Sequence, residues 1–320
     1  VAGAPTETTA IVRYDLDSGA LQLLRRASAI EIAPAFISVP EVVDFPTTGG
    51  VTAHAFYYAP QNPLYQAPVG ERPPLIVFTH GGPTAAVNSA LNLDIQFWTS
   101  RGFGVLDVNY RGSTGYGRTY RELLNGQWGI ADVEDCVAGA QWLAEQGRVD
   151  GRRLLIRGGS AGGYTTLMAL VSTDVFAAGA SYFGVSDAEA LARETHKFES
   201  RYLDWLIGPY PERRDIYLER SPLTHVEKLS RPAIFFQGLD DKIVLPNQAE
   251  MMVEALRKKG IPVAYIAYEG EGHGFRRAEN IVHSRQAELY FYAQVLGLAP
   301  ADELPEIAID NLPRRDGEAG

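Results

Sequence analysis

A run of glycines around one serine constrains this chain more than any other feature of its sequence. Residues 158–163 read Gly-Gly-Ser-Ala-Gly-Gly; the apolar stretch Leu154-Leu155-Ile156 precedes them, and a helical pattern from Tyr164 to Leu170 follows. A strand, a sharp turn and a helix in this order are typical of a nucleophile elbow, which exposes a serine hydroxyl at the edge of a sheet. Gly158 and Gly162 suit the turn, because a side chain there would collide with its strained backbone. A glycine-rich connection without chemistry is the alternative interpretation.

An acid and then a histidine are expected after such a serine. The apolar strand Ala233-Ile234-Phe235-Phe236 leads into Gln237-Gly238-Leu239-Asp240-Asp241, and a later strand, Val263 to Tyr268, runs into a glycine-lined loop that holds His273. Side chains at the carboxyl ends of parallel strands lie where an open sheet places its chemistry. His273 would take the proton of Ser160 as general base, and one of the two adjacent aspartates would orient it. The residues alone leave the choice between Asp240 and Asp241 open.

The other histidines fit this pattern less well. His80 precedes the elbow, and the remaining four have ordinary interpretations as surface, capping or packed polar residues: His54, His196, His225 and His283. His80 opens the turn His80-Gly81-Gly82-Pro83 directly after the apolar strand Leu75 to Thr79. Glycine turns of this kind point backbone N–H groups into an active site. We therefore predict that the N–H groups of Gly82 and Ala161 bind the oxyanion of the transition state.

Several motifs, taken together and in order, resemble the prolyl oligopeptidase family of serine peptidases, in particular its acylaminoacyl peptidase and dipeptidyl aminopeptidase-like branch. Besides the elbow and the acid and histidine loops, they are the His80 turn, Asn109-Tyr110-Arg111-Gly112-Ser113-Thr114-Gly115-Tyr116-Gly117, and Trp128-Gly129 followed by Asp132-Val133-Glu134-Asp135. The resemblance covers residues 75 to about 295. It implies an α/β-hydrolase fold and, because the family's aspartate stands three residues after the glycine ending its strand, it assigns the catalytic role to Asp241.

The resemblance also implies a substrate pocket and an oxyanion hole. Some relatives place a tyrosine in the oxyanion hole at the position that His80 occupies here, so we expect two backbone donors instead. The strand end 182–186 is implied to line the pocket for the acyl side of the scissile bond. Its apolar walls would be Phe183 and Val185, with Tyr164 and Trp205 nearby. Arg111 either lies near the substrate or braces Asp135, and the sequence does not decide.

The predicted function is a serine peptidase that cleaves short peptides or aminoacyl and acylaminoacyl amides through an acyl-enzyme on Ser160. A carboxylesterase on the same fold is the alternative, since ester and amide cleavage use the same residues. A non-catalytic binding scaffold is less favoured because Ser160, Asp241 and His273 are all present. We predict no cofactor and no metal.

Composition excludes several other classes of protein. A formal net charge of −10 and a pI of about 5.2 disfavour a nucleic-acid partner. Cys136 is the only cysteine, which rules out an internal disulfide and a cysteine-rich metal site, and its helical spacing indicates a buried packing residue. No apolar run approaches the roughly 20 residues of a membrane span, and no signal peptide is recognisable. We expect a cytoplasmic protein, although a first residue other than methionine suggests a processed or cut chain.

Patterning along the chain predicts three parts. Residues 1–35 form an N-terminal β segment with a strand pair at 8–26. Members of the family that the chain resembles usually carry a β-propeller before the hydrolase domain, so the resemblance implies that this pair is the remnant of a propeller blade. Residues 36–298 form the catalytic domain: a strand pair at 36–59, then strands at 75–79, 104–109, 153–157, 178–183, 233–237 and 263–268 with helices between them. Residues 299–320 are expected to be a loosely attached tail. Because one blade cannot close a propeller, we expect a propeller domain or companion chain as partner, and a homo-oligomer stays open.

Overall fold

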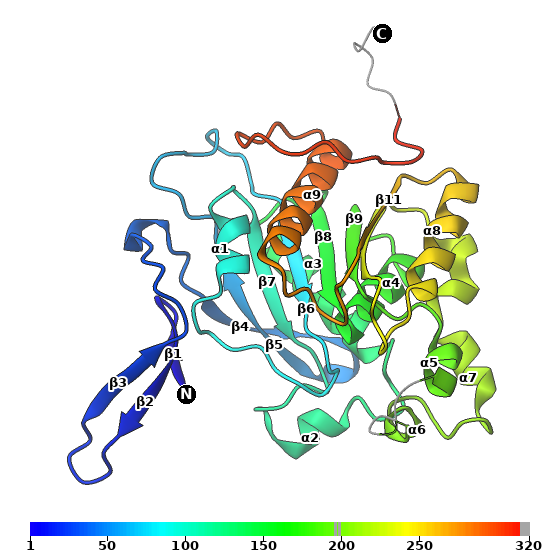
Figure 1. Ribbon diagram of the computed structural model, residues 1–320, viewed down its shortest axis with the longest axis horizontal. Coiled ribbons are helices and arrows are strands. Elements are labelled where there is room, and N and C mark those ends of the chain that lie inside the picture. The colour runs from blue at the N-terminus through cyan, green and yellow to red at the C-terminus, as the bar shows by residue number, and fades with distance from the viewer. Residues whose placement is uncertain (195–196, 198–199, 314–320) are drawn as a thin grey trace, which may run out of the picture.

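Within residues 1–194, 197 and 200–313, which the computed structural model describes, an eight-stranded sheet forms the centre of the molecule (Figure 1). Its strand order is β11-β10-β9-β8-β6-β7-β5-β4. The strands are β4 (Glu41–Pro46), β5 (Thr52–Tyr58), β6 (Leu75–Thr79), β7 (Gly104–Asn109), β8 (Leu154–Gly159), β9 (Ala178–Tyr182), β10 (Ala233–Gly238) and β11 (Val263–Tyr268). The six strands from β6 to β11 are parallel, whereas β5 pairs antiparallel with β7, and β4 pairs antiparallel with β5 at the edge of the sheet.

Helices cover both faces of the sheet, and the alternation of side chains along its strands explains why. On β6, Leu75 and Val77 belong to the apolar core beneath one face, while Ile76, between them, belongs to the core beneath the other. The first core is completed by α3 (Ala131–Glu145), α4 (Ala161–Ser172) and α8 (Asn247–Lys259), and the second by α1 (Leu93–Thr99) and α9 (Ala278–Leu296). Shorter helices lie in the connections: α2 (Gly117–Glu122), α5 (Ala188–Glu194), α6 (Tyr202–Leu206), α7 (Arg214–Glu219), and the 3-10 turns η1 (Pro34–Phe36), η2 (Thr48–Gly50) and η3 (Pro222–Lys228).

The predicted α/β-hydrolase architecture is confirmed, and so are the six predicted strands of the parallel sheet, three of them with the same ends. The strand pair at 36–59 is also present but starts later, at Glu41, because residues 34–36 form η1. This pair extends the central sheet through the contact of β5 with β7.

A separate three-stranded antiparallel sheet precedes the domain and protrudes from it (Figure 1). It consists of β1 (Ala2–Ala4), β2 (Glu7–Tyr14) and β3 (Leu21–Arg26). The strand pair predicted at 8–26 corresponds to β2 and β3, and β1 is an addition that its small residues did not signal. All six residues of β3 are exposed.

The C-terminal segment follows the surface of the domain as far as it is described. Asp310 pairs with Val263 at the edge of β11, and its carboxylate accepts from Arg257 on α8 at 2.6 Å. Further back, Asp302 forms an ion pair with Arg101 at 2.6 Å. Residues 302–310 of the predicted loose tail are therefore held by specific contacts, and residues 314–320 lie outside the described residues. No helix in the described part of the chain is long and apolar enough to cross a membrane.

Candidate active site

The glycine-rich turn around Ser160 joins β8 to α4. Ser160 has φ 56° and ψ −121°, a backbone conformation that non-glycine residues rarely adopt. Its N–H donates to the carbonyl of Tyr182 at the end of β9 (2.9 Å), which anchors the turn to the sheet. A Cβ on Gly162 would lie 2.1 Å from the carbonyl oxygen of Thr79, so only glycine lets α4 approach β6 this closely. The sequence therefore places Ser160, which is half-buried, in the strained backbone conformation of a nucleophile elbow.

His273 and Asp241 lie in a line with this serine. His273 Nε2 is 2.9 Å from Ser160 Oγ, and His273 Nδ1 is 2.8 Å from Asp241 Oδ2. The other carboxylate oxygen of Asp241 accepts from the N–H groups of Ile243 (2.8 Å) and Val244 (3.0 Å). Asp241 is thus buried but fully hydrogen-bonded, which suits an ionised group that orients an imidazole. Its neighbour Asp240 is exposed, and its N–H donates to the carbonyl of Glu271.

The loop that carries His273 is held by the buried carboxylate of Glu271, to which the sequence alone assigned no function. Glu271 accepts from the N–H groups of Arg276 (2.9 Å) and Arg277 (3.0 Å) and from the side-chain amide of Asn280 (2.8 Å). Burial by itself would raise the pKa of Glu271, but these donors outweigh it and lower that pKa. The sequence signal that could have indicated this role is the position of Glu271 two residues before His273 and between two glycines.

The two predicted oxyanion donors flank Ser160. Gly82 and Ala161 line one pocket together with the serine. Ala161 is the first residue of α4, where the N–H groups of a helix are unpaired and the helix dipole favours negative charge. Gly82 has φ +127°, and a Cβ there would lie 2.9 Å from the N–H nitrogen of Thr84. The turn after β6 therefore requires glycine at this position.

The remaining walls of this pocket are mostly apolar. They are Pro83, Trp128, Val185, Leu191, Tyr202, Leu203, Leu206, Ile243 and Val244. Val185 was expected here. Trp205 was expected nearby, but it does not line the pocket and is 42% exposed; its neighbours on α6, Leu203 and Leu206, line the pocket instead.

Two residues expected to contact substrate have other surroundings. Tyr164 is fully buried; its ring packs on Trp128 at 4.1 Å between centroids, and its hydroxyl donates to the carbonyl of Arg220 at 2.8 Å. Tyr164 is therefore packed behind Trp128 and is not among the residues that line the pocket of Ser160. The ring of Phe183 meets His273 edge to face at 4.9 Å, and it lines a second cavity next to Gly158 and Gly159. Phe183 therefore packs against the imidazole and is not among the residues that line the pocket of Ser160.

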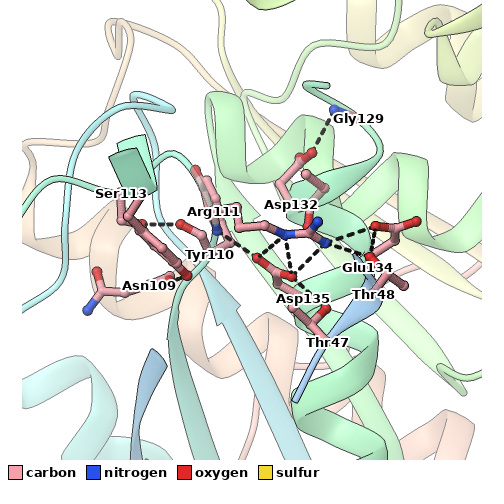
Figure 2. Close-up of polar contacts among 12 residues, drawn as sticks. Thr47, Thr48, Asn109, Tyr110, Arg111, Ser113, Gly129, Asp132, Glu134 and Asp135 are labelled. Carbon is pink, nitrogen blue, oxygen red and sulfur yellow. Dashed lines mark hydrogen bonds and ion pairs between the residues drawn. The ribbon is translucent and has the colours of Figure 1, made fainter. Parts of the chain in front are cut away.

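Arg111 braces the domain and does not line the pocket. Its guanidinium lies between Asp135 and Glu134 at the start of α3, 2.8 Å from each carboxylate (Figure 2). Its N–H also donates to Asp135 Oδ2 at 2.6 Å. Asp135 accepts in addition from Thr47, in the connection between β4 and β5. Of the two alternatives for Arg111, the structure shows the second. His196, interpreted as an ordinary polar residue, lies outside the described residues.

Comparison with known proteins agrees with this geometry. The model of the prolyl oligopeptidase family matches residues 89–299. A puromycin-hydrolyzing peptidase from Mycobacterium tuberculosis superimposes with a TM-score of 0.93 at 48% sequence identity, over 96% of this chain and 47% of that one. Dipeptidyl aminopeptidase BIII from Pseudoxanthomonas mexicana is 35% identical over 70% of this chain and 33% of its own length. An acylamino-acid-releasing enzyme from Arabidopsis thaliana is 30% identical over 66% of this chain and 28% of its own length.

These relatives are much longer than the sequence in hand, which spans about half of the solved structure and about a third of each of the other two. The matched part contains the elbow, the acid loop and the histidine loop, all within residues 89–299. The family match, the similarity of the structures and the aligned side chains of Ser160, His273 and Asp241 lead to one conclusion: the chain belongs to the prolyl oligopeptidase family of serine peptidases.

Proposed function

We propose that this chain is the catalytic part of a serine peptidase that cleaves short peptides or aminoacyl amides through an acyl-enzyme on Ser160. The observation that carries the proposal is the unbroken hydrogen-bonded line from Ser160 through His273 to Asp241, next to a pocket that Gly82 and Ala161 line together with the serine. A serine hydroxyl is a weak nucleophile, and it needs a base within hydrogen-bond reach. At 2.9 Å, His273 Nε2 meets that requirement.

Acylation follows from this geometry. His273 Nε2 takes the proton of Ser160 Oγ while the oxygen attacks the carbonyl carbon of the substrate. The carbonyl oxygen becomes negatively charged, and the N–H groups of Gly82 and Ala161 stabilise it. The C–N bond then breaks as the amine nitrogen receives the proton from His273. Asp241 stabilises the imidazolium throughout and keeps its Nδ1–H toward the carboxylate.

Deacylation repeats these steps with water. His273 removes a proton from a water molecule, whose oxygen attacks the ester carbonyl in the same oxyanion hole. The ester bond breaks, and Ser160 Oγ recovers its proton from His273. The acid product leaves, and every group returns to its starting protonation state, so the cycle needs no further reactant.

The apolar pocket supports a preference on the acyl side of the scissile bond. Leu191, Leu203, Leu206, Val185 and Val244 surround the space next to Ser160, and Trp128 adds an aromatic wall. A pocket of this kind gains free energy from burying an aliphatic or aromatic side chain and offers no paired charge to a charged one. We therefore propose a substrate with an apolar residue on the acyl side. Two relatives, a puromycin-hydrolyzing peptidase and a dipeptidyl aminopeptidase, have names that are consistent with a small aminoacyl or peptide substrate.

The protruding N-terminal sheet supports a further β domain as cover. Ile11, Tyr14, Leu16, Leu21 and Leu23 are all between 45% and 88% exposed on β2, β3 and the turn between them. Sheets bury such residues against a neighbouring layer. Amide hydrogen exchange tests this part: in protein isolated from its source, β3 should exchange more slowly than in the 320-residue chain alone. Equal exchange rates, together with a native mass of 35.0 kDa, would contradict a cover.

Turnover of matched substrates tests the central proposal. A phenylalanyl p-nitroanilide, its N-acetylated form and the corresponding p-nitrophenyl ester carry the same acyl side chain. We expect hydrolysis of at least one anilide, labelling of Ser160 by a fluorophosphonate and loss of both when the serine is replaced by alanine. Ester cleavage without anilide cleavage would instead indicate a carboxylesterase, and absence of labelling would contradict any acyl-enzyme mechanism.

A further inference from the structure

A second cavity, of about 290 Å³, lies beside the nucleophile elbow, and the acyl-enzyme mechanism assigns no function to it. Gly158 and Gly159, which directly precede the catalytic serine, line this cavity together with Phe183 and Phe275. The ring of Phe183 meets the imidazole of His273 at 4.9 Å and the ring of Phe275 at 5.5 Å, both edge to face. The cavity therefore borders the elbow and the histidine loop, and none of its four residues named here lines the apolar pocket.

The acyl-enzyme mechanism places the leaving group of the substrate next to His273. The amine departs with the proton that His273 Nε2 has taken from Ser160, so its nitrogen lies within hydrogen-bond distance of this imidazole. The acyl part stays bound to the serine, beside the apolar pocket. A leaving group that extends past the imidazole therefore reaches Phe183 and the cavity that this ring lines.

Two arginines and one aspartate line this cavity and give it its charge. Arg157, on β8, is buried, and its Nη1 donates to Asp94 Oδ2 at 2.9 Å. Arg285, on α9, donates from Nε to Asp94 Oδ1 at 2.5 Å. Burial alone would raise the pKa of Asp94, but the two guanidinium groups lower it to about 2, so this carboxylate is ionised. The wall thus carries two positive charges and one negative charge, and both oxygens of the carboxylate are already hydrogen-bonded.

Both guanidinium groups keep N–H donors for a ligand. Arg157 Nε lies 2.9 Å from Glu288 Oε1, and Arg285 Nη1 donates to Ser284 Oγ at 3.3 Å. Within residues 1–194, 197 and 200–313, Nη2 of either arginine forms no hydrogen bond. A guanidinium holds five N–H groups in one plane, in a fork that matches a carboxylate. The cavity therefore offers cationic donors that a carboxylate of the substrate can accept from.

Aromatic rings hold these guanidinium groups in place. Arg157 lies over the rings of Phe78, at 4.4 Å from the centroid, and Tyr182, at 5.1 Å. Arg285 lies over the ring of Tyr182 as well, at 4.9 Å. Stacking occupies the face of a guanidinium and leaves its edge, which bears the N–H groups, to acceptors. Tyr182 is itself fixed, because its hydroxyl donates to Glu288 at 2.6 Å, so the donors are positioned before a ligand binds.

The position of Arg157 on β8 sets the length of leaving group that can reach it. Arg157 precedes Ser160 by three residues, which corresponds to about 10 Å at the rise of a strand. Each residue of an extended peptide spans about 3.3–3.6 Å, and the arginine side chain covers part of the interval. One or two residues after the scissile bond therefore bring a C-terminal carboxylate to the guanidinium groups.

We propose that this cavity is the leaving-group subsite, in which Arg285 and Arg157 bind the C-terminal carboxylate of the substrate. The subsite rests on the proposed acyl-enzyme mechanism, and it favours dipeptides and tripeptides with a free carboxylate as substrates. Its aromatic walls accept an apolar side chain of the departing residue. The reaction is unchanged: water cleaves one amide bond, and the product that leaves the cavity is a free amino acid or dipeptide.

Matched peptides test the role of the carboxylate in the wild-type chain. Phe-Ala and Phe-Ala-Ala are compared with their C-terminal amides, which have the same scissile bond and lack the carboxylate. The release of phenylalanine gives kcat/KM for each peptide. Hydrogen bonds between a guanidinium and a carboxylate should favour the free acid by about 10-fold or more in at least one pair. Phenylalanyl p-nitroanilide, which has no carboxylate, reports on the acyl-enzyme mechanism alone.

Variants of the cavity wall assign the preference to its charge. Arg285→Gln should reduce the ratio of kcat/KM between acid and amide to less than about 3-fold. Ile281→Glu adds a negative charge to the wall at a residue that is 39% exposed, and it should lower kcat/KM for the acids more than for the amides. Arg101→Gln is the matched control and should keep the wild-type ratio. Arg101 also stacks on a ring, that of Phe97 at 3.9 Å, and pairs with Asp302, but it lines neither cavity.

The outcomes separate the subsite from the mechanism on which it rests. Equal kcat/KM for acid and amide in both pairs, or hydrolysis of the anilide without hydrolysis of any peptide, overturns the subsite and leaves the mechanism intact. An acid preference that Arg285→Gln leaves unchanged also overturns it, because the arginine then only holds Asp94. If Arg285→Gln does not fold, Ile281→Glu makes the same comparison, and an unchanged ratio overturns the subsite. A wild-type chain that hydrolyses neither anilide nor peptide contradicts the proposed function itself, and the subsite falls with it.

Discussion

The edge of the sheet around Ser160 buries polar side chains, whereas the protruding N-terminal sheet exposes apolar ones. At the first, polar groups are buried and almost every one has a partner: Asp241 has four donors or ring contacts, and Glu271 has three donors. At the second, apolar side chains are exposed and have no layer above them, and Leu16 is 88% exposed. The first region pairs its polar groups within this chain, whereas the strands of the second pair with each other, and β1 contacts the domain through the hydrogen bond from the Leu91 N–H to the Ala4 carbonyl (2.8 Å).

Energetics make the contrast specific. A buried carboxylate that loses its hydrogen-bond donors destabilises the folded state by more than those hydrogen bonds had stabilised it. The hydrogen bonds around Asp241 therefore favour a single arrangement of its carboxylate and of the His273 imidazole. Each large apolar side chain left in water forgoes about 1.5–3 kcal/mol of possible burial energy. We therefore expect a contact of the apolar residues of β2 and β3 with another domain or chain to be stabilised by the burial of their side chains. We expect catalytic geometry to be intrinsic to this chain and the environment of β1–β3 to depend on what surrounds it.

The largest effect is expected from Ser160→Ala. Removing the nucleophile should lower kcat by about 10⁴-fold or more. The free energy of unfolding should change little or rise, because alanine is no larger than serine and therefore adopts the strained φ of 56° at least as easily. Steady-state hydrolysis of an aminoacyl p-nitroanilide measures the loss. Ser172→Ala is the matched control: it lies on α4, and its hydroxyl donates only to the helix carbonyl of Met168. Near-native turnover in Ser160→Ala would refute the mechanism.

The adjacent aspartates should differ by orders of magnitude. Asp241→Asn replaces an acceptor of the His273 Nδ1–H with an amide, so the imidazole can adopt the wrong tautomer, and kcat should fall by about 10³- to 10⁴-fold. Asp240→Asn changes only an exposed side chain and should cost less than about 3-fold. Both values come from the anilide assay at saturating substrate. A larger loss in Asp240→Asn than in Asp241→Asn would mean that the loop rearranges in the functional protein.

Local chain order and patterning were enough to predict the elbow, the histidine loop and the parallel strands, because a strand, its glycine turn and the residues at its carboxyl end are neighbours in sequence. The choice of Asp241 over Asp240 came instead from the family resemblance. The pocket was harder. Tyr164 lies three residues after Ala161 and Phe183 two residues before Val185, and both of these neighbours line the pocket. Yet Tyr164 is fully buried against Trp128, and Phe183, with a φ of 40°, packs against His273. Glu271 has its three partners within nine residues, at Arg276, Arg277 and Asn280, but no helix or strand pattern marks a loop that folds back onto a carboxylate.

A smaller effect is expected for Asp132, a buried acid at the start of α3. It accepts from the N–H of Gly129 (2.6 Å) and the hydroxyl of Thr165 (2.5 Å), but no cation pairs with it among these contacts, and Asp135 lies nearby. Burial raises its pKa to about 6 despite the two hydrogen bonds. The folded state then keeps a proton that the unfolded state, with a pKa of about 3.9, has lost, so stability should fall as pH rises from about 4 to about 6.

Asp132→Asn tests this sign. The variant cannot ionise, so its free energy of unfolding should decline less than that of wild type between pH 4 and pH 6, by about 2–3 kcal/mol over the whole window. Urea unfolding at three pH values in this range measures the difference. Parallel curves for the two proteins would show that Asp132 titrates alike in the folded and unfolded states.

The smallest effect is expected in the N-terminal sheet, and it sharpens the comparison most directly. Leu21 on β3 is 61% exposed, so Leu21→Thr, which keeps the preference for strand, should change the free energy of unfolding of the 320-residue chain by no more than about 0.5 kcal/mol. Leu106→Ala, in the buried core beside β6, should cost about 2–5 kcal/mol in the same urea experiment. A loss above about 1 kcal/mol for Leu21→Thr would show that the sheet packs on the domain after all. A small loss in the chain alone, followed by a larger one in protein from its source, would locate the missing contact on this face.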